Sequence, residues 1–138
     1  MTDTLVDTNV LLDVADDGSE WWAWSSEALR EAADSGSTVI NQVIFAELSA
    51  GYATAEELDT TFAPDRFRRE SIPWEAAFLA GKAYLAYRRA GGIRTAPLPD
   101  FFIGAHAAVR GYRLLTRDPD TYARYFPTID IVSPGGPR

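Results

Sequence analysis

Cysteine is absent from this chain of 138 residues, while histidine and lysine occur once each, as His106 and Lys82. Without cysteine the chain can form neither disulfide bonds nor thiolate metal sites, so we expect it to work in a reducing, cytoplasmic environment. A single histidine excludes histidine-rich metal sites and most serine–histidine–aspartate chemistry. No stretch approaches the roughly 20 apolar residues of a membrane span, and the first residues lack the features of a secretory signal. We therefore expect no membrane partner.

Acidic residues outnumber basic ones, which gives a net charge of -7. Taken alone, this charge argues against a nucleic-acid partner, because phosphate binding usually shows as a basic surface. All but one of the 13 basic residues are arginines, and several are clustered. Solvated helix ends are the simplest explanation of those clusters. Net charge is also misleading where some acids hold metal ions, so the composition does not exclude nucleic acids.

Short apolar segments alternate with helical patterns along the chain. We expect strands at residues 4–7, 38–40, 70–72, 114–116 and 129–132, and helices at residues 10–14, 20–34, 42–50, 55–62, 73–90 and 100–111. This alternation predicts a three-layer α/β/α domain around a central, mostly parallel sheet of about five short strands. We place that domain at residues 1–132 and expect the tail at residues 133–138 to be disordered.

Four carboxylates stand in unusual places. Asp7 follows the first strand within "LVDTNVLLD", and Asp118 follows the fourth strand. Glu47 interrupts the apolar helix at residues 42–50, and Asp100 opens the helix at residues 100–111. Parallel sheets place their functional sites at the carboxyl ends of the strands, so we expect these acids to lie close together.

Each acid also has a purely structural explanation. Asp100 and Asp118 could cap the helices that follow them, with Pro119 at the first helical position after Asp118. Glu47 could lie on the exposed side of an amphipathic helix. Asp7 is the hardest to explain in this way, because burying an unpaired carboxylate is costly.

Convergence of the four acids would raise their pKa values unless a cation lay among them. Mg²⁺ and Mn²⁺ prefer oxygen ligands of this kind. Acid clusters that hold one or two such ions cleave phosphodiesters, because the metal activates a water and neutralises charge on the phosphate. No nucleophilic side chain is needed, and the sequence offers no obvious one.

Four segments together resemble PIN-domain nucleases, and more narrowly VapC-type toxins of bacterial type II toxin–antitoxin pairs. The family's strand ending in Asp, then Thr or Ser and Asn, is similar to "LVDTNVLLD". Its helical glutamate is similar to "FAELSAG", its helix-opening aspartate to "PDFFIGAHA", and its Thr-x-Asp after a strand to "LLTRDPDTYARYFP". No motif is specific alone, but their order and spacing over residues 4–132 are specific together.

The resemblance implies a PIN-like fold and an endoribonuclease that requires Mg²⁺ or Mn²⁺ and acts on single-stranded or loop regions of RNA. It also implies a VapB-type antitoxin as partner and a homodimer. By the motif match, Asp7, Asp100 and Asp118 would be metal ligands, directly or through water. Glu47 would complete the acidic pocket and orient the attacking water.

Further residues are assigned to the site with less support. Asn9 and Thr116 would fix the rotamers of the carboxylates, and Asp120 is a weaker candidate for the same pocket. Arg117 lies between Thr116 and Asp118 in the sequence, which makes it the first candidate for a contact with RNA phosphate. Arg113 is a second candidate for that role.

The segment "EWWAWSS" carries three tryptophans on one predicted helix. Trp22 and Trp24 are two residues apart and point to nearly opposite sides, so both cannot face the core of the domain. Large exposed aromatics mark interfaces, so Trp21, Trp22 and Trp24 are candidates for contact with the antitoxin or a second subunit. Alternatively, neighbouring elements of the same domain enclose the helix. His106 lies off the face of Asp100, which favours a packing or hydrogen-bonding role.

Other functions fit the sequence less well. A receiver-type phosphoacceptor needs a lysine near its aspartate, but Lys82 lies within the long helix. A haloacid-dehalogenase-type phosphatase needs Asp-x-Asp at the first strand, where Asn9 stands at the third position. Two alternatives within the family remain: a PIN nuclease that cleaves DNA or processes RNA, and a non-catalytic PIN module that binds RNA or a partner. The four acids argue against the non-catalytic module.

Overall fold

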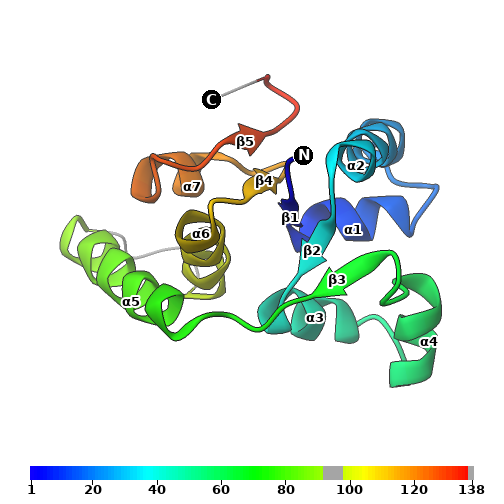
Figure 1. The fold of residues 1–138 in the computed structure, drawn as a ribbon, viewed down its shortest axis with the longest axis horizontal. Coiled ribbons are helices and arrows are strands. Elements are labelled where there is room, and N and C mark those ends of the chain that lie inside the picture. The colour runs from blue at the N-terminus through cyan, green and yellow to red at the C-terminus, as the bar shows by residue number, and fades with distance from the viewer. Residues whose placement is uncertain (92–97, 137–138) are drawn as a thin grey trace.

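A five-stranded parallel sheet runs through the middle of the molecule (Figure 1). The structure is a computed structural model that describes residues 1–91 and 98–136. All four strand pairings are parallel. The strand order is β3-β2-β1-β4-β5, for β1 (Thr4–Val6), β2 (Thr38–Ile40), β3 (Phe67–Arg69), β4 (Arg113–Leu115) and β5 (Ile131–Val132). The predicted parallel sheet is therefore confirmed.

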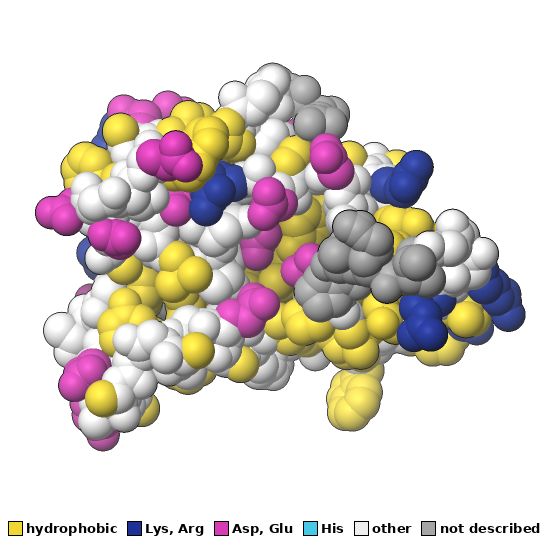
Figure 2. All heavy atoms as spheres, turned by 180° about the vertical axis from the view of Figure 1, so that it is seen from behind, with side chains coloured by type: hydrophobic (Ala, Val, Ile, Leu, Met, Phe, Trp, Pro, Cys, Tyr) yellow, Lys and Arg dark blue, Asp and Glu magenta, His cyan; other side chains and the backbone are white. Residues whose placement is uncertain are grey.

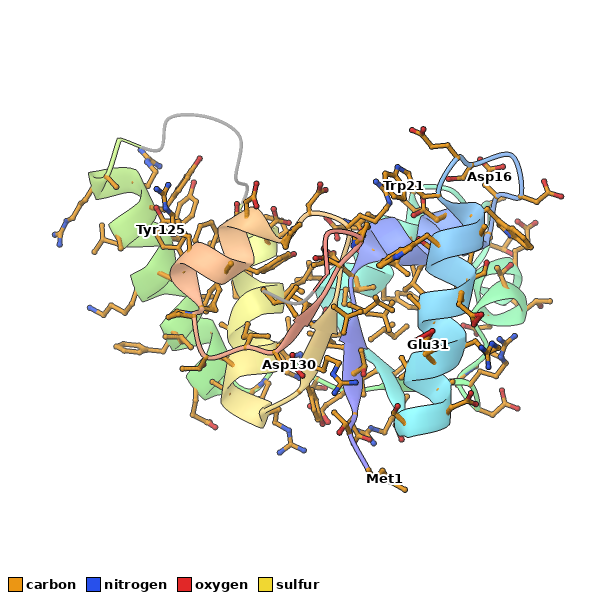
Figure 3. All side chains as sticks on the ribbon, turned by 90° about the horizontal axis from the view of Figure 1, so that it is seen from above. Met1, Asp16, Trp21, Glu31, Tyr125 and Asp130 are labelled. Atoms are coloured by element: carbon orange, nitrogen blue, oxygen red, sulfur yellow. The ribbon has the colours of Figure 1, made fainter. Side chains whose placement is uncertain are left out.

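Helices cover both faces of this sheet, which confirms the predicted three-layer architecture. They are α1 (Thr8–Val14), α2 (Trp22–Ser35), α3 (Gln42–Ser49), α4 (Ala55–Thr61), α5 (Trp74–Arg89), α6 (Leu98–Arg110) and α7 (Asp120–Tyr125). Figure 3 shows α5 and α6 on one side of the strands and α1 and α2 on the other. In the part of the chain that the structure describes, no helix has the length and apolarity needed to cross a membrane.

The strands are short, and the inner strands β1 and β2 are buried along their whole length, as expected for a parallel sheet between helices. Leu5 on β1 lies in register with Val39 on β2 and Leu114 on β4, and all three are fully buried. Because the strands are parallel, their carboxyl ends meet at one edge of the sheet. Asp7 and Thr116 follow β1 and β4 at that edge, so the fold brings together polar residues that are far apart in the sequence.

Several helix ends differ from the sequence-based prediction. α1 begins at Thr8 and not at residue 10, and its N-cap is Asp7, whose Oδ1 accepts a hydrogen bond from the Thr8 N–H at 2.8 Å. α2 begins at Trp22, two residues later than predicted. α6 begins at Leu98, so Asp100 lies in its first turn and does not cap it. Residues 96 and 97 of the predicted loop before α6 lie outside the described residues.

The third strand was predicted in the wrong place. β3 is Phe67–Arg69 and pairs with β2 in the register Ile40 to Arg69, whereas residues 70–72 follow it. Only Phe67 is buried in this edge strand, and Arg68 and Arg69 are exposed. One inward-facing side chain gives no alternating pattern, which is why the sequence favoured the more apolar segment after it.

The C-terminal part adds a helix that the sequence showed only as a capping signal. α7 is preceded by Pro119 at its N-cap, with no side-chain capping bond, so the explanation of Asp118 as a cap is wrong. Beyond β5, the Gly136 N–H donates to the Ser133 carbonyl in a turn at 3.0 Å. The last two residues of the tail lie outside the described residues.

Candidate active site

The four predicted acids line one pocket of about 310 Å³ at the carboxyl edge of the sheet. Figure 2 shows acidic side chains gathered around a hollow in the middle of one face of the molecule. The lining residues are Asp7, Thr8, Asn9, Leu12, Glu47, Asp100, Asp118, Thr121 and Tyr122. The expectation that these acids lie close together is therefore met.

Each acid reaches the pocket from a different element. Asp7 stands between β1 and α1, Asp100 lies in the first turn of α6, and Asp118 lies in the segment between β4 and α7. Glu47 comes from α3, which is fixed at its start because Asn41 accepts the Ile44 N–H at 3.0 Å. The carboxyl ends of β1 and β4, the first turn of α6 and the capped helix α3 thus determine the geometry of the site.

Asp7 is buried, with 6% of its surface exposed, and is held by several hydrogen bonds. Its Oδ2 accepts from the Thr116 hydroxyl at 2.8 Å and from the Tyr122 hydroxyl at 3.1 Å. Burial raises the pKa of Asp7, the hydrogen bonds from Thr116, Tyr122 and the Thr8 N–H oppose that change, and the charge of Glu47 adds to it. These hydrogen bonds fix the position of the Asp7 carboxylate, but no lysine or arginine among the described lining residues neutralises its charge.

Asp100 shows how much negative charge the pocket concentrates. Burial, together with the charges of Asp7, Glu47 and Asp118, raises the pKa of Asp100 to about 7. Burial and the charges of Asp7, Asp100 and Glu47 raise the pKa of Tyr122 well above its usual value, so its hydroxyl stays neutral and can donate. Among the described lining residues there is no lysine or arginine to offset the acids.

Asn9, Thr116 and Thr8 connect the acids to one another. The Asn9 amide nitrogen lies 3.4 Å from oxygens of Asp7, Thr116 and Asp118. The Thr116 hydroxyl also accepts the Asp118 N–H at 3.0 Å. The Thr8 hydroxyl donates to Glu47 Oε1 at 2.6 Å, so Thr8 braces Glu47 and contacts Asp7 through its backbone.

The donor set of the pocket suits a hard divalent cation, because all four acidic groups offer carboxylate oxygens. As the side chains stand, no three acidic or histidine groups within the described residues are close enough together to hold an ion. Their mutual repulsion, visible in the raised pKa of Asp100, opposes closer approach without a cation. A bound cation would remove that repulsion and draw the carboxylates together.

The two predicted RNA-binding arginines do not line the pocket. The Arg117 Nε donates to Asp13 Oδ2 at 2.5 Å, and its guanidinium lies 5.3 Å from the centre of the Trp21 ring. Arg113 stands at the start of β4, at the opposite edge of the sheet, where its Nε lies 3.0 Å from Asp130. Asp120 is exposed at the start of α7 and is not among the lining residues.

The tryptophans divide as the helical spacing predicted. Trp24 packs against the core, Trp21 is half-buried, and Trp22 is 42% exposed. His106 is fully buried, with Nε2 2.8 Å from Glu70 and Nδ1 3.0 Å from the Asn41 amide nitrogen. The predicted packing and hydrogen-bonding role of His106 is what the contacts show.

Thr121 and Tyr122 are pocket residues to which the sequence analysis gave no role. Thr8 was expected to turn the chain and brace Asp7, and its backbone N–H does bond Asp7, but its bond to Glu47 was not predicted. Tyr122 lies within the fourth motif segment, and its bond to Asp7 spans 115 positions of the sequence. An aromatic after Thr-x-Asp was the one available signal. The bond from the Tyr122 hydroxyl to Asp7 became visible only in the structure, which brings α7 to the carboxyl end of β1.

Comparison with known proteins agrees with this geometry. The family model of the PIN domain matches residues 4–127, which include all four acids. The chain belongs to the PIN-domain family. A search of curated proteins finds no match.

Solved structures share this PIN fold over almost the whole chain. VapBC2 from Rickettsia felis, solved with a promoter DNA fragment, is 15% identical, with a TM-score of 0.73 over 96% of this chain and 98% of that one. A toxin–antitoxin complex from Klebsiella pneumoniae is 24% identical, with a TM-score of 0.68 over 95% and 97%. DNA-bound VapBC from Salmonella typhimurium is 22% identical, with a TM-score of 0.69 over 96% and 98%.

Proposed function

We propose that this PIN-domain chain is a VapC-type toxin that hydrolyses RNA phosphodiester bonds as a Mg²⁺- or Mn²⁺-dependent endonuclease. The observation that carries the proposal is the convergence of four carboxylates on one pocket without a basic side chain among the described lining residues. Such a pocket repels a phosphodiester unless a cation is bound. With a divalent cation in place, the same pocket attracts phosphate and can activate water.

In this proposal Asp7, Asp100 and Asp118 would hold the cation, which would neutralise charge on the phosphate and activate a water. Thr116 and Tyr122 keep the Asp7 carboxylate in one orientation through their hydroxyls. Glu47, held by the Thr8 hydroxyl, orients the attacking water and accepts its proton. Asn9 links Asp7 and Asp118, so the two strand-end acids keep a fixed separation.

We also propose that a VapB-type antitoxin binds this chain. The support is that the similar folds were solved as VapBC or toxin–antitoxin complexes and that each aligns over nearly its full length. Trp22 remains a candidate for this contact because it is exposed on α2.

A homodimer is the second assembly that we propose, and α5 offers a surface for it. Trp74 and Phe78 are 88% and 69% exposed, and Leu85 continues the same stripe. An antiparallel pair of α5 helices, centred between residues 81 and 82, would set Phe78 against Leu85 of the second copy. The same pairing would bring Glu75 to Arg88, and opposite charges there favour it over a parallel pair.

RNA cleavage by purified protein, freed of any bound partner, tests the activity. We expect cleavage of a mixed RNA substrate with Mg²⁺, none with EDTA, and a loss of at least about 100-fold in Asp7→Asn. The matched control is Asp16→Asn, which changes an exposed acid after α1 and should cleave like the wild type. Mg²⁺-dependent cleavage that survives in Asp7→Asn would place the active site elsewhere. Cleavage of DNA and not RNA would favour the DNA nuclease.

A further inference from the structure

Asp13 is a buried acid outside the pocket, and its partners form a compact cluster. It lies near the end of α1 with 5% of its surface exposed. Its carboxylate accepts from the Ser25 hydroxyl at 2.7 Å and the Ser19 hydroxyl at 3.1 Å. Arg117 adds two bonds, from Nε to Oδ2 at 2.5 Å and from Nη2 to Oδ1 at 3.2 Å. This fork-to-fork contact fixes both position and orientation.

Arg117 lies in the sequence between Thr116, which supports Asp7, and Asp118, which lines the pocket, but its own side chain does not line the pocket. The guanidinium of Arg117 instead crosses to α1 and lies against the Trp21 ring at 5.3 Å. Nε and Nη2 of Arg117 are thus engaged by a buried carboxylate on the side of the guanidinium away from the pocket.

Helix α1 therefore holds the segment between β4 and α7 at two points. At its start, Asn9 Oδ1 accepts the Arg117 N–H at 3.2 Å, and the Asn9 amide nitrogen lies 3.4 Å from Asp118. At its end, Asp13 holds the Arg117 side chain. One anchor bonds the backbone of Arg117 and the other bonds its side chain, which restrains both the position and the orientation of the segment.

We propose that the Asp13–Arg117 pair holds residues 116–118 in position, so that the Thr116 hydroxyl reaches Asp7 and Asp118 lines the acidic pocket. The pair contacts neither the proposed cation nor the substrate, so both are positioning residues and not catalytic ones. The proposal rests on the proposed function only for its effect on metal binding, since holding the segment is a property of the metal-free protein as well.

The test compares Arg117→Met and Asp13→Asn with the wild type. Arg117→Lys retains one charge and donor at the same place. Arg113→Met is the matched control, because Arg113 stands at the start of β4, the strand that precedes Arg117, and pairs with Asp130 at the opposite end of that strand. Circular dichroism of each variant should first show that it is folded.

The first readout needs no metal. Amide hydrogen exchange, followed by NMR at Arg117 and Asp118, should become about tenfold faster in Arg117→Met and Asp13→Asn, with amides of β2 and α5 unchanged. Unchanged exchange at Arg117 and Asp118 in both folded variants would overturn the proposal, whether or not the protein binds metal.

The second readout is Mn²⁺ affinity, measured from the electron paramagnetic resonance signal of free Mn²⁺. We expect Mn²⁺ affinity to fall about tenfold in Arg117→Met and Asp13→Asn, to recover in part in Arg117→Lys, and to be unchanged in Arg113→Met.

Faster exchange with undiminished Mn²⁺ affinity would overturn the link to the pocket. Unchanged exchange and Mn²⁺ affinity with weaker RNA binding would make Arg117 an RNA contact instead. A wild type that binds no Mn²⁺ would contradict the proposed function, and the exchange measurement alone would then decide whether the pair holds the segment.

Discussion

Among the four pocket acids, Asp100 has the pKa that shows the effect of burial and neighbouring charge most clearly. Burial and the charges of Asp7, Glu47 and Asp118 raise its pKa from 3.8 to about 7. The folded protein therefore binds more protons at this residue than the unfolded chain does between these two values. The contribution of Asp100 to the free energy of unfolding therefore falls as pH rises through that window, because folding then places a charged carboxylate in an acidic, partly buried site.

The pH dependence gives a prediction for Asp100→Asn. In EDTA, this variant should match the wild type near pH 4 and be more stable by roughly 1–3 kcal/mol at pH 8, less than the ~4 kcal/mol that the full pKa change represents because the site is partly solvated. Urea unfolding at the two pH values measures this difference. Mn²⁺ should then stabilise the wild type but not the variant. Equal stability at pH 8 would mean that Asp100 is not under repulsion.

The sequence identified the acids of the site better than their partners. Asp7 stood out because it interrupts an apolar segment, and the four motifs together marked the others. The pairing of Arg117 with Asp13 was not predicted, because the two residues lie 104 positions apart and no local pattern indicates which way a loop arginine points. The bond of Thr8 to Glu47 and that of Tyr122 to Asp7 were missed for the same reason.

At the scale of elements, the close approach of α6 and α7 keeps Asp100 and Tyr122 on the same pocket. Gly104 on α6 makes this approach possible. A Cβ at position 104 would lie 2.4 Å from a ring carbon of Phe126, whose ring is buried at the end of α7. The small residues of "PDFFIGAHA" thus have a packing role that accompanies the site role of Asp100.

Replacing Gly104 by alanine should therefore disturb the pocket indirectly. We expect Gly104→Ala to lower the free energy of unfolding by about 1–3 kcal/mol, because overpacking here outweighs the gain in helix propensity. Denaturant unfolding measures the change. Gly51→Ala, just after α3, is the control: among the described residues its added Cβ meets only the Leu48 carbonyl oxygen, at an ordinary contact distance of 3.7 Å, so it should be close to neutral. A stabilised Gly104→Ala protein would show that α6 and α7 are not tightly packed at this point.

Strands with consecutive apolar residues were predicted well, and elements defined by long-range contacts were not. β1, β2 and β4 were found near their observed positions because each contains two consecutive buried apolar residues. β3 was misplaced because its place is set by pairing with β2 and by Phe67 alone. The start of α6 was misplaced because Asp100 resembles a capping residue, whereas the helix begins two residues earlier.

At the scale of the whole molecule, the exposed stripe on α5 is the surface that predicts assembly. We expect light scattering after size exclusion to give twice the 15.2 kDa of one chain for the wild type and about one chain for Phe78→Glu. Trp22→Glu is the control, because Trp22 is exposed on α2 at the other side of the sheet. A dimer that persists in Phe78→Glu and dissociates in Trp22→Glu would assign the interface to the tryptophan helix. A monomeric wild type would contradict the proposed homodimer.

The central claim is that the four carboxylates at the carboxyl edge of the sheet form a divalent-metal site. Calorimetric titration of Mn²⁺ into the purified protein at pH 8 tests this most directly. We predict binding to the wild type and to Asp16→Asn, and a loss of affinity of at least about tenfold in each of Asp7→Asn, Asp100→Asn and Asp118→Asn. Equal Mn²⁺ affinity in the wild type and all three pocket variants, or no binding to the wild type, would contradict the account.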